Sequence, residues 1–427
     1  MPAATPARYP RMRKLLRQLG PGLITGAADD DPSGIATYSQ AGAQFGYGML
    51  WAVLVTFPLM VAIQLVSARI GCVTGRGVAS NIRRHYPAGL LHAIVVLLLL
   101  ANTVNIAADI GAMGQALRLV IGGPAHAYAL AFGVASVLLQ VFLPYPRYAP
   151  LLKLMVTALF AYVATLFIVD VPWSEVLARI VSPGVALGRE YVVVLVAVLG
   201  TTISPYLFFW QASQEVEDQQ TSGHPAPLIE RPRGASRELG RIEVDTYVGM
   251  GFSNFIAFCI MLTSALTLHA NGVTDIRSAA DAANALRPIA GDFTFFLFSL
   301  GIVGTGLLAI PVLAGSAAYA VAEAFRWPRG LSRLPGEAPG FYGIIVAATL
   351  IGVAIDFSPI DPFKALIWAA VVNGVVAVPI MVVMMRLAAR RDVMGRFVIS
   401  RRLAWTGWGS TCVMTAAVAA LLVMLLS

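Results

Sequence analysis

Gly22-Leu-Ile-Thr-Gly-Ala-Ala-Asp-Asp-Asp-Pro-Ser-Gly-Ile-Ala-Thr-Tyr38 is the stretch on which the fold depends. Its three consecutive carboxylates, at positions 29–31, stand inside an apolar segment about long enough to cross a bilayer. Charge at that depth is costly, and such residues usually face a cavity or an ion path. Pro32 removes a helical amide donor and Gly34 weakens the helix further, so we predict a helix that breaks at the carboxylates.

A broken turn presents carboxylate oxygens together with free backbone carbonyls, which is the ligand set that a hard cation needs. The alternative is that the aspartates only cap a helix end at the membrane surface. Apolar sequence flanks them on both sides, and this favours the buried cation site.

The composition is that of a membrane protein. The chain has 427 residues, of which 58% are hydrophobic and 12% are charged, whereas soluble domains carry roughly 25% charged residues. The net charge of +8 does not indicate a nucleic-acid partner, because Arg and Lys stand in short loops. The three cysteines and five histidines show no ligand spacing, so we expect no disulfide framework, no zinc site and no cofactor.

Apolar runs predict an all-α fold with eleven membrane spans. A basic segment at 1–19 is expected to be cytoplasmic, and 20–427 is expected to form one transmembrane domain in the inner membrane of the cell. The third and eighth spans are long enough to require tilt or an extension beyond the membrane. The predicted spans are 20–42, 47–71, 89–121, 125–144, 149–169, 191–213, 245–269, 292–324, 340–357, 361–387 and 404–426.

Basic residues gather in alternate loops, which sets the expected orientation. By the positive-inside rule the N-terminus is predicted to be cytoplasmic and the C-terminus external. The basic loops include Arg83 and Arg84, Arg231 to Arg241, Arg326 to Arg333 and Arg386 to Arg402. The longest loop, at 214–244, is rich in Pro and Gly and is expected to be cytoplasmic and at most partly ordered.

A second interruption lies in the sixth span, Val193-Val-Leu-Val-Ala-Val-Leu-Gly-Thr-Thr-Ile-Ser-Pro-Tyr-Leu-Phe-Phe-Trp-Gln211. Polar residues and Pro205 divide it midway. Interruptions at corresponding positions of two halves indicate the central site of a transporter. Five spans separate the two breaks, so the repeat is expected to be inverted, with halves at about 20–169 and 191–387 and an extra helix at about 404–426. A simple proline kink in span six is the alternative.

These features resemble those of the NRAMP family of divalent-metal transporters. The resemblance covers most of the chain: the Gly20-Pro-Gly-Leu start, the Asp31-Pro32 break, the eleven spans and the break in span six all fit. It implies a LeuT-type inverted repeat of five plus five helices, with discontinuous helices 1 and 6 and one helix after the repeat.

The resemblance also implies a ligand set. The family's first-span motif is Asp-Pro-Gly-Asn, whose Asp and Asn bind metal, and here it reads Asp31-Pro-Ser-Gly34. The Asp is therefore kept, while the Asn position is a glycine. The family's span-six motif supplies an Ala carbonyl and a Met sulfur, and the matching positions here are Thr201 and Ser204.

The exchange of Met for Ser204 carries the substrate prediction. A thioether suits transition metals, whereas oxygen ligands suit Mg²⁺, Ca²⁺ and Mn²⁺. Small residues at 34 and 204 would also leave room for water, which Mg²⁺ keeps when it binds. Asp29 and Asp30 would attract a hydrated dication. The pattern resembles the NRAMP-related magnesium transporters, so we predict Mg²⁺ as the substrate, with Mn²⁺ as the other candidate.

The same comparison predicts weak or absent proton coupling. Two histidines that the family associates with proton movement correspond here to Tyr206 and Gln211, neither of which exchanges protons near neutral pH. In span three, the family's Asp position is Ile106 and its Glu position is Asp109. Asp109 is either a residual polar gate or a carboxyl hydrogen-bonded between helices.

Further pathway candidates each have a structural alternative. Asn105 could line the vestibule or join two helices, and Asn373 lies near the family's polar ligand position or is a packing amide. Glu215 and Glu217 either line the cytoplasmic side of the path or are solvated charges at a helix end.

Two other functions compete with this prediction. A proton-coupled Mn²⁺ or Fe²⁺ importer is disfavoured by the missing Met and His. A carrier of amino acids or other organic solutes is disfavoured because three aspartates repel a substrate carboxylate. The chain shows no nucleophile–base pair, so we expect no enzyme. The expected partners are the dication and the lipid bilayer, and no obligate protein partner is evident.

Overall fold

A computed structural model describes residues 20–143, 154, 157–184, 188–221 and 226–426. The described part of the chain is helical and contains no strand. The helices relevant to the membrane are α2 (Pro21–Asp29), α3 (Pro32–Phe45), α4 (Leu50–Thr74), α6 (Ala88–Ile121), α7 (Ala125–Phe142), α11 (Arg189–Thr202), α12 (Pro205–Thr221), α13 (Ala235–Thr267), α16 (Thr294–Phe325), α17 (Pro339–Asp356), α18 (Pro362–Ala389) and α20 (Arg401–Leu426).

Both predicted helix breaks are confirmed. α2 ends at Asp29 and α3 begins at Pro32, while α11 ends at Thr202 and α12 begins at Pro205. In each case a proline occupies the first position of the second half-helix, where its missing N–H costs no intrahelical hydrogen bond. The two prolines therefore stop one helix and start the next, rather than kinking a continuous one.

Most predicted spans correspond to helices of the expected length. Nine helical segments among the described residues are long and apolar enough to cross a membrane, and one of them joins α3 to α4 across a short turn. The third and eighth spans are long, as expected, with 34 residues in α6 and 32 in α16. The fifth span is only partly described: α9 covers Phe160–Thr165, and 149–153 and 155–156 lie outside the described residues, as do 1–19. The count of eleven therefore remains a prediction.

The bounds predicted for the loop at 214–244 are wrong, because helix occupies both of its ends. α12 continues to Thr221 and α13 already begins at Ala235, so helix occupies much of this stretch. Gln and Glu favour the helical state after span six, and Arg241 in the first turns of α13 binds Glu215 on α12. This contact joins the two helices that flank residues 222–234. Residues 222–225 lie outside the described part.

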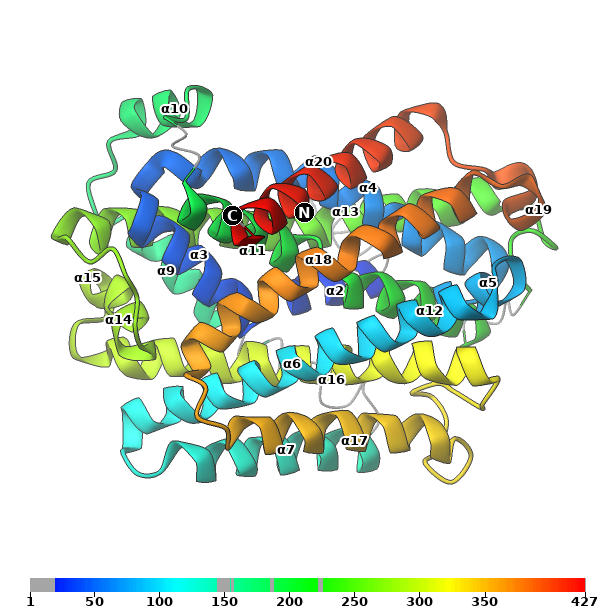
Figure 1. Ribbon diagram of the computed structural model, residues 1–427, viewed down its shortest axis with the longest axis horizontal. Helices are drawn as coiled ribbons and strands as arrows, with labels where there is room; N and C mark the ends of the chain where they lie inside the picture. Colours follow the sequence, from blue (N-terminus) through cyan, green and yellow to red (C-terminus); the bar gives the residue numbers. More distant parts are fainter. Residues whose placement is uncertain (1–19, 144–153, 155–156, 185–187, 222–225, 427) are drawn as a thin grey trace, which may run out of the picture.

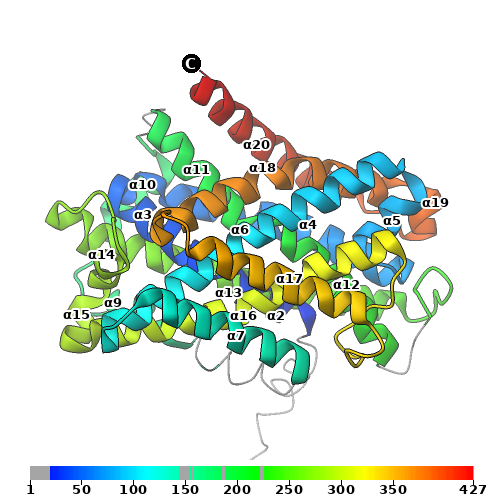
Figure 2. The ribbon, with the colours of Figure 1, turned by 60° about the horizontal axis from the view of Figure 1, so that its bottom comes forward.

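The helices run roughly along one axis and their connections gather at two ends (Figure 1). α10 (Trp173–Val181), α14 (Ala279–Ala283) and α15 (Arg287–Ala290) lie at one end, while α5 (Val78–His85) and α19 (Arg391–Met394) lie at the other. α7 and α17 form an outer layer against α6, as Figure 2 also shows. The end with α5 and α19 is the arginine-rich side of the alternating loops, and we call it the basic side.

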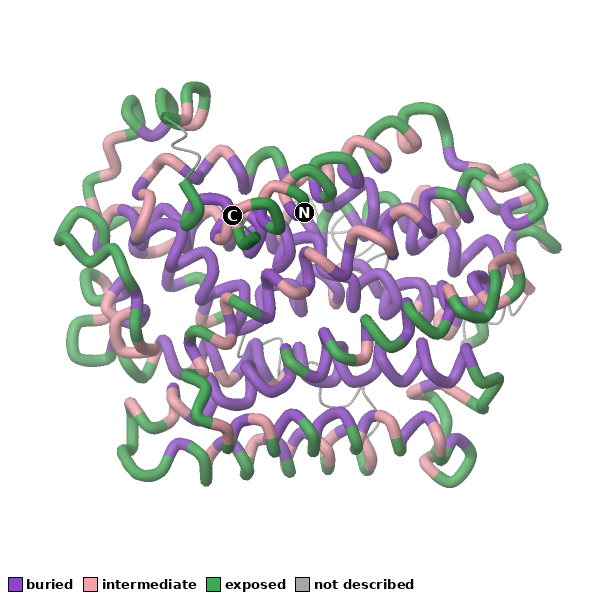
Figure 3. Tube along the Cα trace, in the orientation of Figure 1, coloured by how far each residue is buried: buried purple, intermediate pink, exposed green. Residues whose placement is uncertain are grey.

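The burial pattern suits a lipid environment. Figure 3 shows buried residues through the middle of the bundle and exposed residues on the outer helices and the connections. Large apolar side chains such as Leu100, Leu138 and Trp405 are exposed on these outer faces, whereas polar and acidic side chains are buried in the centre. This distribution is expected where lipid is the solvent, because polar groups must then be satisfied inside the protein.

The half-helix α2 packs tightly against α13. A side chain at Gly26 would place its Cβ 2.1 Å from the carbonyl oxygen of Gly249, and one at Gly249 would come equally close to the carbonyl oxygen of Gly22. Small residues are typical of such close contacts between membrane helices. The contact fixes the end of α2, and therefore the carboxylates that follow it, against α13.

Candidate functional site: two helix breaks that meet

Asp31 begins the second half of the first span. It is the N-cap residue of α3, and its Oδ1 atom accepts hydrogen bonds from Ser33 Oγ at 2.6 Å and from the Gly34 amide at 2.8 Å. An aspartate is among the preferred N-caps because its oxygen satisfies an amide that has no partner within the helix. One carboxylate oxygen is thus held by its own turn, and the other points toward neighbouring helices.

That second oxygen joins α3 to α6 and α12, and further hydrogen bonds extend the group to α18 and α2. Asp31 Oδ2 accepts from Asn105 Nδ2 of α6 at 3.0 Å and lies 3.4 Å from the hydroxyl of Tyr206 in α12. The side-chain oxygen Oδ1 of Asn105 accepts from Asn373 Nδ2 of α18 at 3.1 Å. The Tyr206 hydroxyl is also 3.1 Å from the Ala28 carbonyl at the end of α2. The predicted residues Asp31, Asn105, Tyr206 and Asn373 therefore form one connected group.

Asp109 belongs to the same group. Asn105 Nδ2 lies 3.3 Å from Asp109 Oδ2, so one amide contacts two carboxylates. The other oxygen of Asp109 and the side-chain oxygen of Asn373 are buried without a hydrogen-bond partner among the described residues. Asn373 thus links α18 to α6, whereas the hydrogen bond of Asp109 to Asn105 stays within α6, and the roles of both residues in the ion path stay predictions.

The three consecutive aspartates face different neighbours. Asp29 and Asp30 lie toward α13, where Ser253 Oγ is 2.6 Å from Asp29 Oδ2 and 3.1 Å from Asp30 Oδ1. Asp29 Oδ1 and Asp30 Oδ2 are buried and have no hydrogen-bond partner among the described residues. Asp31 points instead to α6 and α12, because it already belongs to the next half-helix.

The second break supplies hydroxyl groups. Ser204 Oγ lies 2.8 Å from the carbonyls of both Gly200 and Thr201, and Thr202 Oγ1 donates to the Val198 carbonyl at 2.6 Å. Thr202 Oγ1 also lies 3.0 Å from the hydroxyl of Tyr38 in α3, which joins the two breaks directly. In this conformation the Ser204 hydroxyl is turned back toward the end of α11.

Gly34 faces Thr201 across the gap between the breaks. A Cβ at position 34 would lie 3.2 Å from Thr201 Oγ1 and 3.3 Å from the Asp29 carbonyl oxygen. A side chain there would press on both oxygens. Because Gly34 has no side chain, a small space remains beside the Thr201 hydroxyl and the Asp29 carbonyl oxygen.

The central carboxylates have no basic partner among the residues that the structure describes. Asp29, Asp30, Asp31 and Asp109 are each 0–1% exposed. Within the described ranges no Arg or Lys forms an ion pair with any of them. Buried carboxylates are costly unless they are paired, protonated or bound to a cation. The site is thus suited to accept positive charge.

Gln211 and Glu215 lie further along α12, outside this group. Gln211 Oε1 accepts from Gln64 at 2.5 Å, and its amide nitrogen donates to Thr246 at 3.1 Å. Glu215 is not the solvated charge that one alternative proposed: it is fully buried, and Arg241 Nη2 lies 2.6 Å from its Oε2.

Three contributors were missed from the sequence. Ser253 gave no signal, because a serine in an apolar helix is common. Asp245 accepts from the amides of Gly20, Gly22 and Leu23 and so holds the start of α2. Glu323 lies near the end of α16 and is 1% exposed. Asp245 and Glu323 are carboxylates inside predicted spans. Treating every carboxylate within a span as a candidate functional residue would have found both.

The arrangement defines a class of protein. Two discontinuous helices that meet in the centre of an all-helical bundle, with polar groups gathered at the breaks, are the hallmark of a LeuT-type membrane transporter and not of an enzyme. A family model described as natural resistance-associated macrophage protein-like, or Nramp, matches residues 22–424. The chain belongs to the Nramp family.

Solved structures have the same fold. A manganese transporter of Eremococcus coleocola, in complex with an aromatic bis-isothiourea compound, has a TM-score of 0.75 at 15% identity, covering 97% of this chain and 88% of that one. MhsT in complex with L-phenylalanine has a TM-score of 0.58 at 14% identity, covering 95% and 97%. Mhp1, a nucleobase-cation-symport-1 family transporter, has a TM-score of 0.56 at 12% identity, covering 95% and 91%. The expected LeuT-type fold is confirmed.

Proposed function

We propose that this protein transports divalent metal cations across the membrane, with Mg²⁺ as the preferred ion and Mn²⁺ as an alternative, by alternating access with weak or no proton coupling. The observation that carries the proposal is the group of four buried carboxylates, Asp29, Asp30, Asp31 and Asp109, which lacks a basic partner in the described chain. A dication supplies the missing charge where the two breaks meet.

The donor set favours a hard ion. Around the gap lie the Asp31 carboxylate, the hydroxyl of Thr201 and the carbonyl oxygen of Asp29. Oxygen donors suit Mg²⁺ and Mn²⁺. A Cβ at position 34 would already lie 3.2 Å from Thr201 Oγ1, so an ion that keeps some of its water requires the two breaks to move apart. Asp31 is the principal ligand in this proposal. Thr201 and Ser204 contribute after small movements of the α11 end, and Asp29 and Asp30 add attraction.

Family and fold support metal transport without selecting the ion. The Eremococcus coleocola relative is a manganese transporter, while MhsT holds L-phenylalanine on a similar fold. A substrate carboxylate would meet carboxylates at the first break here, so an organic acid is disfavoured on electrostatic grounds. The orientation proposed from the basic loops places the N-terminus in the cytoplasm and the C-terminus outside.

A proton-coupled importer of Mn²⁺ or Fe²⁺ is the second candidate. It is favoured by Asp109, whose Oδ1 is buried without a partner beside the proposed ligand group. Against it, Tyr206 and Gln211 occupy the positions of the family's histidines and are engaged in hydrogen bonds.

Uptake into proteoliposomes tests both candidates. Mg²⁺, Mn²⁺, Ca²⁺ and Cd²⁺ compete in pairs against the purified full chain, while an internal dye reports pH. We expect Mg²⁺ uptake that Mn²⁺ inhibits, with no acidification beyond that of empty vesicles. Internal acidification that follows metal influx would favour the importer. Equal uptake by wild type and by Asp31→Asn would remove the central site from the mechanism.

A further inference from the structure

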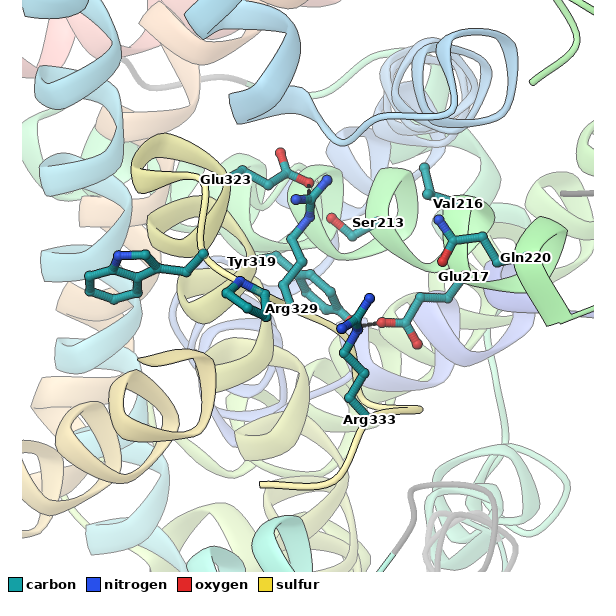
Figure 4. Close-up of a pocket in the computed structure, with 10 residues that line it drawn as sticks. Ser213, Val216, Glu217, Gln220, Tyr319, Glu323, Arg329 and Arg333 are labelled. Carbon is teal, nitrogen blue, oxygen red and sulfur yellow. Dashed lines mark hydrogen bonds and ion pairs between the residues drawn. The ribbon is translucent and has the colours of Figure 1, made fainter. Parts of the chain in front are cut away.

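A second oxygen-lined cavity lies between α12, α16 and the loop that joins α16 to α17, at the basic side (Figure 4). Its volume is about 160 Å³, which is room for several water molecules. Its wall holds oxygen-bearing side chains together with two guanidinium groups: Ser213, Glu217, Gln220, Tyr319, Glu323, Arg329 and Arg333. The oxygen atoms are donors of the kind that a hydrated hard cation prefers, and the two arginines compete with such a cation for the carboxylates.

The cavity adjoins the helix that leads away from the central site. Tyr206, which contacts Asp31, and Glu217 are eleven residues apart on α12, or about 16 Å along the helix. Between them Trp210 packs against Gly315 and Tyr319: a Cβ on Gly315 would lie 2.7 Å from the Trp210 ring. Trp210 therefore lies on α12 between the residue that contacts Asp31 and the residue that lines the cavity, and its ring contacts that of Tyr319 in the cavity wall.

Two acidic side chains in the cavity are held by parts of the same loop. Glu217 accepts from the Tyr319 hydroxyl and from the Leu331 amide, the latter at 2.9 Å. Glu323 accepts from the Ser80 amide at 2.8 Å, and Arg329 Nε lies 3.3 Å from its other oxygen. In Figure 4, Arg329 lies toward Glu323.

The ion pair of Arg329 is unequally buried. The Glu323 side chain is 2% exposed, whereas that of Arg329 is 30% exposed and stands on the connecting loop. The guanidinium can therefore move into solvent, while the carboxylate stays buried between α16 and α5. A buried carboxylate that loses its counter-ion strongly favours another cation in its place.

We propose that this cavity is a second binding site for the transported dication, on the basic side of the central site, and that Arg329 is the tethered cation with which the ion competes for Glu323. The proposal rests on the proposed function for the identity of the ion. When the Trp210–Tyr319 contact opens, the dication meets Glu217 and Glu323. The return of Arg329 to Glu323 then displaces the ion toward the basic side.

Binding of Mn²⁺ to the full chain in detergent tests this site, with the free-ion electron paramagnetic resonance signal as readout. Asp31→Asn serves as background, because it disables the central site. In that background we expect weak residual binding. Adding Arg329→Gln should tighten it about tenfold, since the arginine that pairs with Glu323 is gone. Adding Glu323→Gln to the double variant should abolish it.

Two controls keep the result specific. Arg326→Gln removes a charge from the start of the same loop but does not line the cavity, and it should leave Mn²⁺ binding unchanged. If Glu323→Gln fails to give a monodisperse protein, Glu217→Gln replaces it in the double variant, and binding should weaken likewise.

The outcomes separate this inference from the proposed function. The absence of Mn²⁺ binding in Asp31→Asn/Arg329→Gln would overturn it, as would binding that survives both glutamate substitutions. A tightening by Arg326→Gln equal to that by Arg329→Gln would also overturn it, because general charge would then explain the effect. Failure of wild-type uptake would instead reject the proposed function, and the binding measurement does not depend on uptake.

Discussion

Asp31 at the central breaks and Glu323 at the basic-side cavity are each 1% exposed, yet their partners differ. Asp31 is surrounded by neutral donors: a serine hydroxyl, a backbone amide, an asparagine amide and a tyrosine hydroxyl. Glu323 has a guanidinium as counter-ion in addition to an amide. Neutral donors orient a carboxylate without cancelling its charge, whereas an arginine cancels it. The comparison indicates where the protein itself completes the charge balance and where it leaves this to the substrate.

Replacing the central carboxylate should have the largest effect on transport. Asp31→Asn keeps the shape but removes the charged ligand, and losing one partner of a buried ionic interaction costs about 3–5 kcal/mol, or at least 100-fold in affinity. Glu323→Gln should change uptake only a few-fold, because its charge is already balanced. Initial rates of Mg²⁺ uptake in proteoliposomes compare the two. Equal losses would contradict the distinction between the sites.

The identity of the donor at position 204 should affect selectivity next most strongly. Ser204→Met supplies a thioether at the second break, and we expect preference to move toward Cd²⁺ over Mg²⁺ by about tenfold. Competition of the two ions for uptake measures this ratio. Ser204→Ala is the control, since it removes the hydroxyl without adding sulfur. A ratio that stays flat in Ser204→Met would show that position 204 does not face the ion.

The Ser253 hydroxyl, which donates to both Asp29 and Asp30, should raise the free energy of unfolding. Ser253→Ala leaves two buried carboxylates without their common hydroxyl, and we expect a loss of about 1–3 kcal/mol in the free energy of unfolding. Added Mn²⁺ should restore part of it, because a ligand of the folded state stabilises it. Thermal unfolding in detergent provides the measurement.

Ser264→Ala is the matched control for that variant. Ser264 lies on the same helix, and its hydroxyl is buried without a partner. Its removal should not lower the melting temperature. If both variants lower the melting temperature by the same amount, the loss would come from general packing of α13. The hydrogen bonds to the two carboxylates would then not explain it.

The smallest effect is expected at the cavity loop. Gly330 has φ +127°, and a Cβ there would lie 2.7 Å from Glu217 Oε1. Gly330→Ala should therefore loosen the loop by about 1 kcal/mol. Limited trypsin digestion at Arg326, Arg329 and Arg333 should become faster. Gly336→Ala, in the same connection but with open space around it, should digest at the wild-type rate. Identical digestion of both variants would show that Glu217 does not hold the loop.

Local chemistry was strong enough to predict both helix breaks and much of the polar group around them. Proline and glycine act on their own turn, so Pro32 and Pro205 located the breaks without tertiary information. Tyr206 and Asn373 were named from the resemblance to the family and Asn105 as a polar residue of span three, and the structure joins all three to Asp31 directly or through Asn105. Their binding roles stay a prediction.

The sequence was less informative where partners come from distant helices. The three aspartates look equivalent along the chain, but the change from α2 to α3 sends Asp29 and Asp30 to Ser253 and Asp31 to Asn105. Glu215 looked solvated because hydrophilic residues surround it, and only the packing of α13 shows its buried contact with Arg241.

The sequence by itself determined an all-helical membrane protein with two interrupted spans and carboxylates at the first interruption, because hydropathy and proline act locally and strongly. Only the tertiary structure decided which carboxylates have counter-ions. The partners of a buried carboxylate come from other helices: Arg241 pairs with Glu215, 26 residues away, and Ser253 donates to Asp29, 224 residues away, and no local pattern encodes these contacts.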